Sequence, residues 1–337
     1  MVRIPSSTTA SEPRGPGAHS GYGDSVEIAY RIGVDGGGSG TRARLLRASG
    51  ELLGEGQSGP SNLAQGIEQA WRHVQEAIAR AQDAALVTAH AGLAAHAAPS
   101  APATSPTPLQ PPLLPSNTAL GLGLAGANNP LLHAQFLQAN PGYRLIALHS
   151  DAYATLLGAH GARAGAIIAV GTGSVGLARW ADGHTRTVGG WGFPSGDDGS
   201  GALLGLQAMN HSQQVQDGIE AGGPLAQAVL QATGGNAQAM LQWCCEAGQT
   251  RFASLAPLVF AHAAHDPAAA HLLAQARACI ERMAAALDPE HSLPLALLGS
   301  IGRLLAPGLS ASLQARLVAP LGDAMDGALQ LCTKPLP

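Results

Sequence analysis

The chain has 337 residues, a length that predicts about two domains because one hydrophobic core seldom grows beyond roughly 250–300 residues. Hydrophobic residues make up 46% of the chain and charged residues 12%, which indicates a globular protein and excludes a disordered one. The net charge of -4, without a basic cluster, argues against nucleic acid and anionic membranes as partners and favours a small molecule.

The beginning of the chain and the cysteines bear on location. Residues 1–26 are rich in Pro, Ser and Gly and lack the apolar core of a secretory signal, so we expect a flexible extension. No apolar run reaches the ~18 residues of a membrane span. The four cysteines show neither a CxxC pair nor zinc-ligand spacing. These features predict a soluble protein of the reducing cytoplasm.

From residue 28 the pattern predicts three antiparallel strands, EIAYRIGV, TRARLL and LLGEG, with the turn DGGGSG between the first two. Residues 67–85 carry apolar side chains at helical spacing, which predicts an amphipathic helix packed on the sheet. The Pro-rich segment 97–117 is expected to be a surface insertion. Two apolar runs follow, TALGLGLAGA and YRLIALHSDA, and predict buried strands around a helical segment.

Residues 164–192 repeat this opening unit, because they again read strand, Gly-rich turn, strand, Asp-Gly turn and strand. A long helical region, 201–290, then precedes the strand LPLALLG and closing helices that end near residue 332. We therefore expect two related domains, 27–160 and 161–332, each presenting one Gly-rich turn to the cleft between them. The last helix is a candidate for packing back on the first domain.

The two Gly-rich turns are candidates for phosphate binding. GTGSVG at 171–176 matches G-x-G-x-x-G, but hairpin sequence follows it where a dinucleotide site needs a helix. A Walker A loop is excluded because Lys334 is the only lysine. Phosphate would then be held by backbone N–H groups, by the hydroxyls of Thr41 and Thr172, and by Mg²⁺ bound through water to Asp35. The alternative is that both turns are only tight hairpins.

Asp151 follows a predicted strand and precedes a helix, where a carboxylate can accept the proton of a substrate hydroxyl. The competing interpretation is that Asp151 caps the helix. In the Gly-rich loop 189–205, Asp198 or Ser200 is a candidate helix cap, and Asn62 is a turn residue by composition. The 13 histidines show no metal-ligand spacing.

Three blocks, VDGGGSGTRARL, AVGTGSVG and GGWGFPSGDDGSGALLG, resemble the BadF/BadG/BcrA/BcrD ATPase family, and within it the N-acetylglucosamine and glucosamine kinases. The resemblance covers about residues 29–330, with LLGSIGRLL similar to the adenosine motif of the family. It implies an α/β fold of two duplicated actin-like ATPase domains, ribonuclease H-like in topology, around a nucleotide and sugar cleft. It also implies an ATP- and Mg²⁺-dependent sugar kinase, for which a homodimer would be unsurprising.

The resemblance also implies a role for each matching residue. Asp151 would be the base that activates the 6-hydroxyl of the sugar. The residues implied to bind ATP and Mg²⁺ are Asp35, Gly37, Gly38, Thr41, Thr172, Gly173, Gly299 and Gly302. The residues implied to line the sugar pocket are Asn62, Ser174, Gly189, Gly190, Trp191, Gly192, Phe193 and Asp197.

The chain departs from the family pattern at Asp198, where a glutamate is common, and in the Pro-rich segment and the leader, which the family does not explain. A related branch activates dehydratases through an iron–sulfur cluster, but the cysteines here lack the required pattern. An ATPase or sugar sensor without phosphotransfer stays as the alternative. N-acetylglucosamine stands slightly ahead of glucosamine as the expected substrate, and N-acetylmuramate-type sugars remain open.

Overall fold

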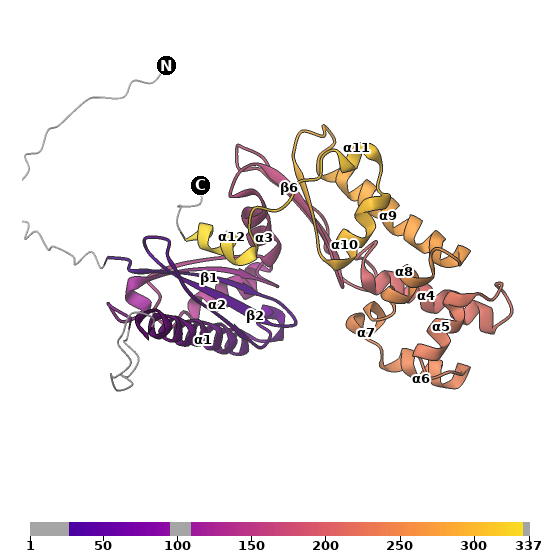
Figure 1. Ribbon diagram of the computed structural model, residues 1–337, viewed down its shortest axis with the longest axis horizontal. Coiled ribbons are helices and arrows are strands. Elements are labelled where there is room, and N and C mark those ends of the chain that lie inside the picture. Colours follow the sequence, from indigo (N-terminus) through magenta and orange to yellow (C-terminus); the bar gives the residue numbers. More distant parts are fainter. Residues whose placement is uncertain (1–26, 95–108, 333–337) are drawn as a thin grey trace, which may run out of the picture.

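A computed structural model describes residues 27–94 and 109–332. The 26-residue extension and most of the Pro-rich segment therefore lie outside the described residues. The chain forms two lobes, each built on one β-sheet (Figure 1). None of the described helices is long and apolar enough to cross a membrane.

The first sheet has the strand order β3-β2-β1-β4-β5. Strands β1 to β3 form an antiparallel meander, and β4 and β5 run parallel to β1. The bounds are β1 Tyr30–Gly36, β2 Thr41–Arg47, β3 Leu52–Ser58, β4 Thr118–Leu124 and β5 Leu145–His149. All seven positions of β4 are buried, as expected for a strand covered on both faces.

The second sheet repeats this topology with one strand fewer, in the order β8-β7-β6-β9. Again three antiparallel strands are followed by a strand parallel to the first. The bounds are β6 Gly165–Val170, β7 Ser174–Arg179, β8 Thr185–Gly189 and β9 Leu295–Leu298. The shared order confirms the duplication that the sequence predicted.

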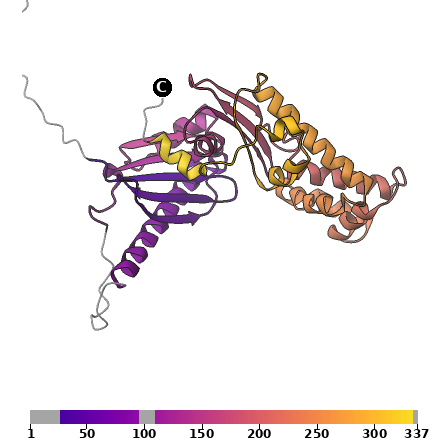
Figure 2. The same cartoon turned by 45° about the horizontal axis from the view of Figure 1, so that its top comes forward.

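Helices cover both faces of the first sheet (Figures 1 and 2). Helix α1, Ile67–Ala94, extends beyond the predicted segment and packs on β2 and β3, while α12, Ala324–Leu331, packs on β1 and β4 from the opposite face. Glycines allow this approach, because a Cβ at Gly121 would lie 1.8 Å from Ala328 O. The other helices here are α2 Pro130–Gln138, α3 Asp151–His160 and the 3-10 turns Leu63–Gln65 and Pro115–Asn117.

The second lobe holds most of the helices, arranged around α4 and the long helix α9 (Figure 1). Their bounds are α4 Gly201–Gln216, α5 Pro224–Ala232, α6 Ala237–Glu246, α7 Gln249–Ala253, α8 Ala256–His262, α9 Pro267–Leu287, α10 Ser300–Leu305, the 3-10 turn Ala306–Gly308 and α11 Ala311–Gln314.

A third, smaller apolar cluster joins the lobes. It contains Tyr153 and Leu156 of α3, Ile167 of β6, Leu177 of β7 and Leu331 of α12. Helices α3 and α12 therefore form the junction between the two sheets. The main cores of the two lobes are separate clusters from this junction.

Candidate active site

The carboxyl ends of three parallel strands meet at one edge of the first sheet. In register across that edge lie Asp35 of β1, Gly123 of β4 and His149 of β5. Asp151 follows two residues after His149, and a Cβ at Gly123 would lie 3.6 Å from its Cα atom. The fold thus brings Asp35 and Asp151 to the same edge, although they lie 116 positions apart in the chain.

Asp151 begins helix α3 but does not cap it. The cap is Ser150, whose Oγ accepts a hydrogen bond of 3.2 Å from Tyr153 N, so the capping interpretation of Asp151 is wrong. Asp151 Oδ1 accepts one hydrogen bond of 2.8 Å from Ala152 N. Burial raises the pKa of Asp151, the Ala152 hydrogen bond opposes this rise, and the charge of Asp35 adds to it. A carboxylate in this environment is a better proton acceptor than an exposed one.

His149 gives Asp151 no compensating positive charge. Burial, followed by the neighbouring His133, lowers the pKa of His149 to about 4, so its imidazole is neutral at pH 7. The ring stacks on Tyr153 with 3.7 Å between centroids, and its Nδ1 accepts a hydrogen bond from Ser150 N. His149 therefore fixes the start of α3 without pairing with the acid.

The first Gly-rich turn connects β1 to β2 and is open on its outer side. Gly37 N donates a 3.0 Å hydrogen bond to Gly40 O. A Cβ at Gly37 or Gly38 would meet nothing within 4 Å, whereas one at Gly36 would lie 2.0 Å from Ser61 Oγ. The protein itself therefore requires glycine at Gly36 but leaves room for a ligand over Gly37 and Gly38.

Thr41 lies under this turn instead of beside it. Its side chain is 1% exposed, and its hydroxyl is 2.7 Å from Gly59 O and 2.7 Å from Ser61 Oγ. In this structure the Thr41 hydroxyl thus bonds to protein groups, and its contact with phosphate stays a prediction. Thr41 instead ties the turn to the Gly-Pro-Ser-Asn loop, whose Ser61 N also donates to Gly37 O.

Asn62 follows in that loop and behaves as the turn residue that composition predicted. Its Oδ1 accepts a 3.0 Å hydrogen bond from Ala64 N and caps the turn Leu63–Gln65. Its amide nitrogen has no hydrogen-bond partner among the described residues and lies on the same loop as the Ser61 contact. Asn62 is thus close to the first turn and retains a free donor.

Asp35 is paired with an arginine that the sequence analysis did not single out. Arg42 faces it across the β1–β2 ladder, and Asp35 Oδ2 lies 2.5 Å from Arg42 Nη2 and 3.2 Å from Nε. Arg42 Nη1 also lies 3.8 Å from Asp323 at the start of α12. The two side chains are 45% and 22% exposed, so this ion pair is accessible to solvent and weak.

The second Gly-rich turn connects β6 to β7 and is held by the start of α4. Gly201 N donates to Gly171 O at 2.8 Å, and Ala202 N donates to Thr172 O at 3.1 Å. Thr172 is exposed, and a Cβ at Gly171 would meet nothing within 4 Å. This turn therefore also faces open space, with the Thr172 side chain available.

Asp197 braces the second turn from behind. It is 6% exposed with a φ of 63°, and its Oδ1 accepts a 3.3 Å hydrogen bond from Ser174 N. Its Oδ2 accepts a 2.8 Å hydrogen bond from Gln249 and would lie 2.8 Å from a Cβ at Gly173. Ser174 Oγ in turn donates to Asp198 O. Asp197 and Ser174, expected to line a sugar pocket, thus bind neighbouring protein groups in this structure.

Between β8 and α4, the loop of Gly189 to Phe193 exposes one large aromatic side chain. Gly189, Gly190 and Gly192 have φ values of 75°, 75° and 85°, which favour glycine. Trp191 among them is 85% exposed, while Phe193 packs on Phe252 with 5.5 Å between ring centroids. Phe193 anchors the loop, and the glycines leave Trp191 outside the core. At the end of the loop, Ser200 caps α4, which settles the choice between Asp198 and Ser200.

Gly299 and Gly302 lie at the start of α10, next to the second turn. Gly299 has a φ of 82°, and a Cβ there would lie 2.2 Å from Val170 O. A Cβ at Gly302 would lie 3.2 Å from Leu297 Cδ1. Glycine is therefore needed at Gly299 for packing alone, whatever the backbone binds beyond it.

These residues form two groups on different sheets. Asp35, Asp151, Asn62 and the first turn belong to the first lobe, and the second turn, the Trp191 loop and Gly299 belong to the second. Among the described residues no hydrogen bond joins one turn to the other. A ligand contacting both groups would therefore bind between the lobes.

The supporting residues Ser61, Arg42, His149 and Gln249 were missed from the sequence. The hairpin register gives a signal for Arg42, which faces Asp35, whereas Ser61 reaches the turn through a loop that the register does not include. Gln249 lies 52 residues after Asp197, and no local pattern connects the two.

The profile of the BadF/BadG/BcrA/BcrD ATPase family matches residues 32–293. A glucosamine kinase of Vibrio cholerae serotype O1 is 35% identical over 308 residues, which cover 91% of this chain and 96% of that kinase. An N-acetylmuramic acid/N-acetylglucosamine kinase of Clostridium acetobutylicum is 29% identical over 186 residues, covering 54% of this chain and 53% of that kinase.

Solved structures agree with the fold. The crystal structure of a candidate N-acetylglucosamine kinase from Chromobacterium violaceum has a TM-score of 0.79 and 42% identity, covering 91% of this chain and 99% of its own. A second candidate N-acetylglucosamine kinase, from Porphyromonas gingivalis, has a TM-score of 0.63 at 19% identity and bears on the fold alone. These likenesses, with the two sheets, confirm the expected fold of two duplicated actin-like domains.

Proposed function

This chain belongs to the BadF/BadG/BcrA/BcrD ATPase family, and from that premise we propose that it is an ATP-dependent kinase that phosphorylates an amino sugar at the 6-hydroxyl. The observation that carries the proposal is the similarity to a glucosamine kinase over 96% of its length. The placement of Asp151 supports it, because this residue lies at the edge of the sheet, does not cap α3 and has a raised pKa.

In the proposed reaction Asp151 accepts the proton of the sugar hydroxyl as its oxygen attacks the γ-phosphorus. The new oxygen–phosphorus bond forms while the bond to the β-phosphate oxygen breaks, and ADP leaves. Backbone N–H groups of the two turns would contact the phosphates, with Thr172 as a hydroxyl donor. The neutral His149 leaves Asp151 free to take up the proton.

Asp35 is the proposed partner of Mg²⁺, which supplies neutralisation of phosphate charge when bound with ATP. The donor set fits, because Mg²⁺ is usually bound by one or two carboxylates together with substrate phosphates and waters. Asp35 lies close enough to Asp151 to influence its pKa, and its carboxylate now faces Arg42. Arg42 would therefore have to release Asp35 when the cation binds.

That release is testable with Arg42→Gln. Removing a weak, exposed ion pair should lower the Mg²⁺ concentration for half-maximal activity by about two- to five-fold, which corresponds to roughly 0.4–1 kcal/mol. Arg47→Gln is the matched control, since Arg47 pairs with Glu51 on the same sheet, away from Asp35. An unchanged or increased Mg²⁺ requirement in Arg42→Gln would show that Arg42 does not compete for Asp35.

Both groups of residues are needed for the reaction, so the lobes are proposed to close on the substrates about the junction of α3 and α12. Closure would exclude water and limit ATP hydrolysis without sugar. Trp191 is proposed to lie against the sugar in the closed form, as the exposed aromatic residue of a loop that is rich in glycine.

Replacing Trp191 by alanine should raise KM for the sugar about ten-fold, equivalent to about 1.4 kcal/mol, and leave KM for ATP unchanged. The protein should unfold at the same temperature, because Trp191 is 85% exposed. Leu241→Ala, at a 65% exposed position on α6, serves as the control. An equal rise of both KM values would assign Trp191 to general closure instead of sugar contact.

The decisive experiment is a coupled assay of ADP release with ATP and Mg²⁺, with the sugar product identified by mass spectrometry. Glucosamine, N-acetylglucosamine, N-acetylmuramate, glucose and no sugar are compared. Stimulation by one amino sugar with formation of its phosphate supports the kinase, whereas ADP release without a phosphorylated sugar favours the ATPase or sensor alternative. The order of N-acetylglucosamine before glucosamine, the cytoplasmic location and the homodimer stay predictions.

A further inference from the structure

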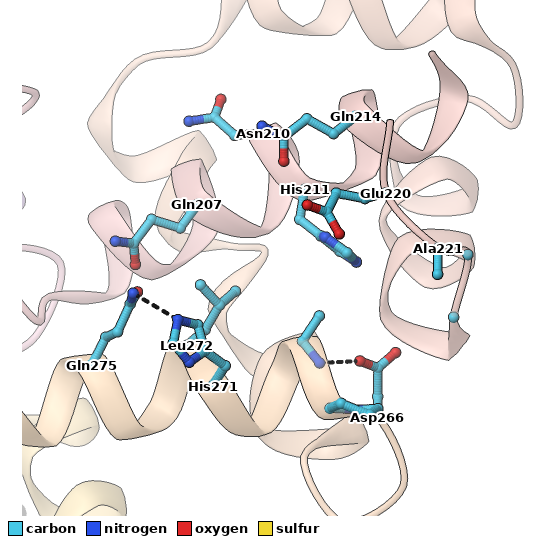
Figure 3. A pocket seen from close by; sticks show the side chains of 14 residues that line it. Gln207, Asn210, His211, Gln214, Glu220, Ala221, Asp266, His271, Leu272 and Gln275 are labelled. Carbon is cyan, nitrogen blue, oxygen red and sulfur yellow. Dashed lines mark hydrogen bonds between the residues drawn. The ribbon is translucent and has the colours of Figure 1, made fainter. Parts of the chain in front are cut away.

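A cavity of about 620 Å³ opens in the second lobe (Figure 3), and its lining includes no residue of either Gly-rich turn. Its walls are the outer face of α4, the loop after α4, and the beginning of α9. The volume lies within the range of small-molecule sites, roughly 300–1,000 Å³. None of the residues described above for the kinase reaction lines this cavity.

One wall is a polar stripe on α4. Gln207, Asn210, His211 and Gln214 follow at helical spacing and share one face of the helix. Their side chains make no hydrogen bonds to other described residues, and Figure 3 shows those of Gln207 and His211 directed toward the space before α9. Four neighbouring side chains with free donors and acceptors are unusual on the Ala-rich helices of this lobe and suit a ligand with several hydroxyl groups.

The opposite wall is the first part of α9. Gln275 Nε2 donates to His271 Nε2 at 2.9 Å, which orients both side chains (Figure 3). Leu272 between them is 8% exposed and provides an apolar floor. The cavity therefore combines an apolar base with polar groups on two sides, as small-molecule sites commonly do.

The charges of the lining select among such compounds. The described lining residues include two acids, Glu220 and Asp266, two histidines, His211 and His271, and neither arginine nor lysine. His211 lies near Asp266, whose pKa is influenced by its charge. Both carboxylate oxygens of Asp266 are already engaged by the protein. They accept hydrogen bonds from Leu225 N at 2.8 Å, Ala268 N at 2.8 Å and Ala269 N at 3.1 Å. The exposed Glu220 carboxylate has no partner among the described residues. The cavity thus disfavours phosphorylated ligands and favours one with an ammonium group.

Helix α4 also connects this cavity to the second Gly-rich turn. Gln207 and Gln275 line a second cavity of about 310 Å³ that reaches Asp198 and Gly199. Asp198 O accepts the Ser174 hydroxyl, and the first turn of α4 holds Gly171 and Thr172. One helix therefore carries the polar stripe on its outer face and the second Gly-rich turn at its beginning.

We propose that this cavity is a second binding site for an unphosphorylated amino sugar of the glucosamine class, with its ammonium group beside Glu220 and its hydroxyls on the amides of α4. The choice of an amino sugar rests on the proposed function, whereas the preference for an amine over a phosphate rests on the lining charges. ATP and sugar phosphates do not bind there.

Equilibrium dialysis of the full-length protein against radiolabelled glucosamine, without ATP, tests the site up to about 10 mM. The native protein is expected to bind two glucosamine molecules per chain and the Glu220→Gln variant one. The affinity of the cavity for glucosamine should fall at least ten-fold in this variant. Asp217→Asn, an exposed acid three positions earlier that does not line the cavity, should still bind two. The pair Gln207→Leu and Gln214→Leu should remove the same class, and Gln216→Leu on another face of α4 should not.

The outcomes separate this site from the kinase proposal. One bound molecule that Glu220→Gln abolishes supports the cavity and counts against sugar binding between the lobes. Binding that Glu220→Gln and the double variant leave unchanged overturns the cavity, whatever the kinase assay gives. The proposal is also overturned if glucosamine 6-phosphate displaces glucosamine from the Glu220-dependent site as well as unlabelled glucosamine does, because the cavity should exclude a dianion.

Discussion

Replacement of Asp151 by asparagine is expected to lower kcat by about 10²- to 10⁴-fold, the usual contribution of a positioned general base. The asparagine preserves the shape of the side chain at the start of α3, where Ser150 supplies the cap, so ATP binding should persist. Asp83→Asn, an exposed acid on α1, is the control and should retain full activity. Retention of kcat in Asp151→Asn would exclude Asp151 as the base.

The same substitution should stabilise the protein at neutral pH. The folded-state pKa of Asp151 is raised, so the stability that this group contributes is present below its unfolded pKa and lost as pH rises through its folded pKa. At pH 8 the asparagine variant should therefore melt at a higher temperature than the native protein, and at pH 4 the difference should shrink. Activity should fall on the acid side at a higher pH than for an exposed aspartate.

Replacement of Gly327 by valine is expected to destabilise the protein by about 3 kcal/mol or to prevent folding. A Cβ at Gly327 would lie 1.7 Å from Ala154 O and 2.7 Å from Gly158 N, which are backbone atoms of α3 that cannot move aside. Helix α12 would have to leave α3 and the sheet. The free energy of unfolding in urea measures the effect.

Gly248→Val is the matched control for this substitution. Gly248 precedes α7 in an extended conformation, with a φ of -95°, and a Cβ there would meet nothing within 4 Å. A small effect at Gly248 beside a large one at Gly327 would assign the loss to the contact between α3 and α12. Equal stability of both variants would mean that α12 does not need the close approach.

The strands and turns could be predicted because each is encoded locally. The alternation in TRARLL and the Gly-rich turns mark the hairpins. The same sequence pattern recurs at residues 164–192 and predicted a second sheet, which has the same strand order. The sequence also pointed to Asp151, but it could not decide between base and cap. The hydrogen bond from Tyr153 N to Ser150 Oγ excludes the cap, and the role of Asp151 as the base stays a prediction.

Contacts between distant segments were beyond sequence reasoning. Thr41 reads as an exposed turn hydroxyl, yet the Gly-Pro-Ser-Asn loop folds over it and buries it. Asp197 reads as a pocket residue, yet Gln249 from α7 holds it against the second turn. The polar stripe of α4 is visible in the sequence only as a run of Gln, Asn and His, because its meaning depends on α9 lying opposite.

The position of α12 has a consequence for synthesis of the chain. Its contacts with β1 and β4 join segments about 300 and about 200 residues apart, so one face of the first sheet, at Gly33 and Gly121, stays uncovered until residues 324–331 have left the ribosome. The first lobe is made early but completed last, after the whole second lobe has been translated. Nascent chains halted before α12 should therefore expose an apolar sheet surface, and chaperone binding to them should end only when that helix emerges.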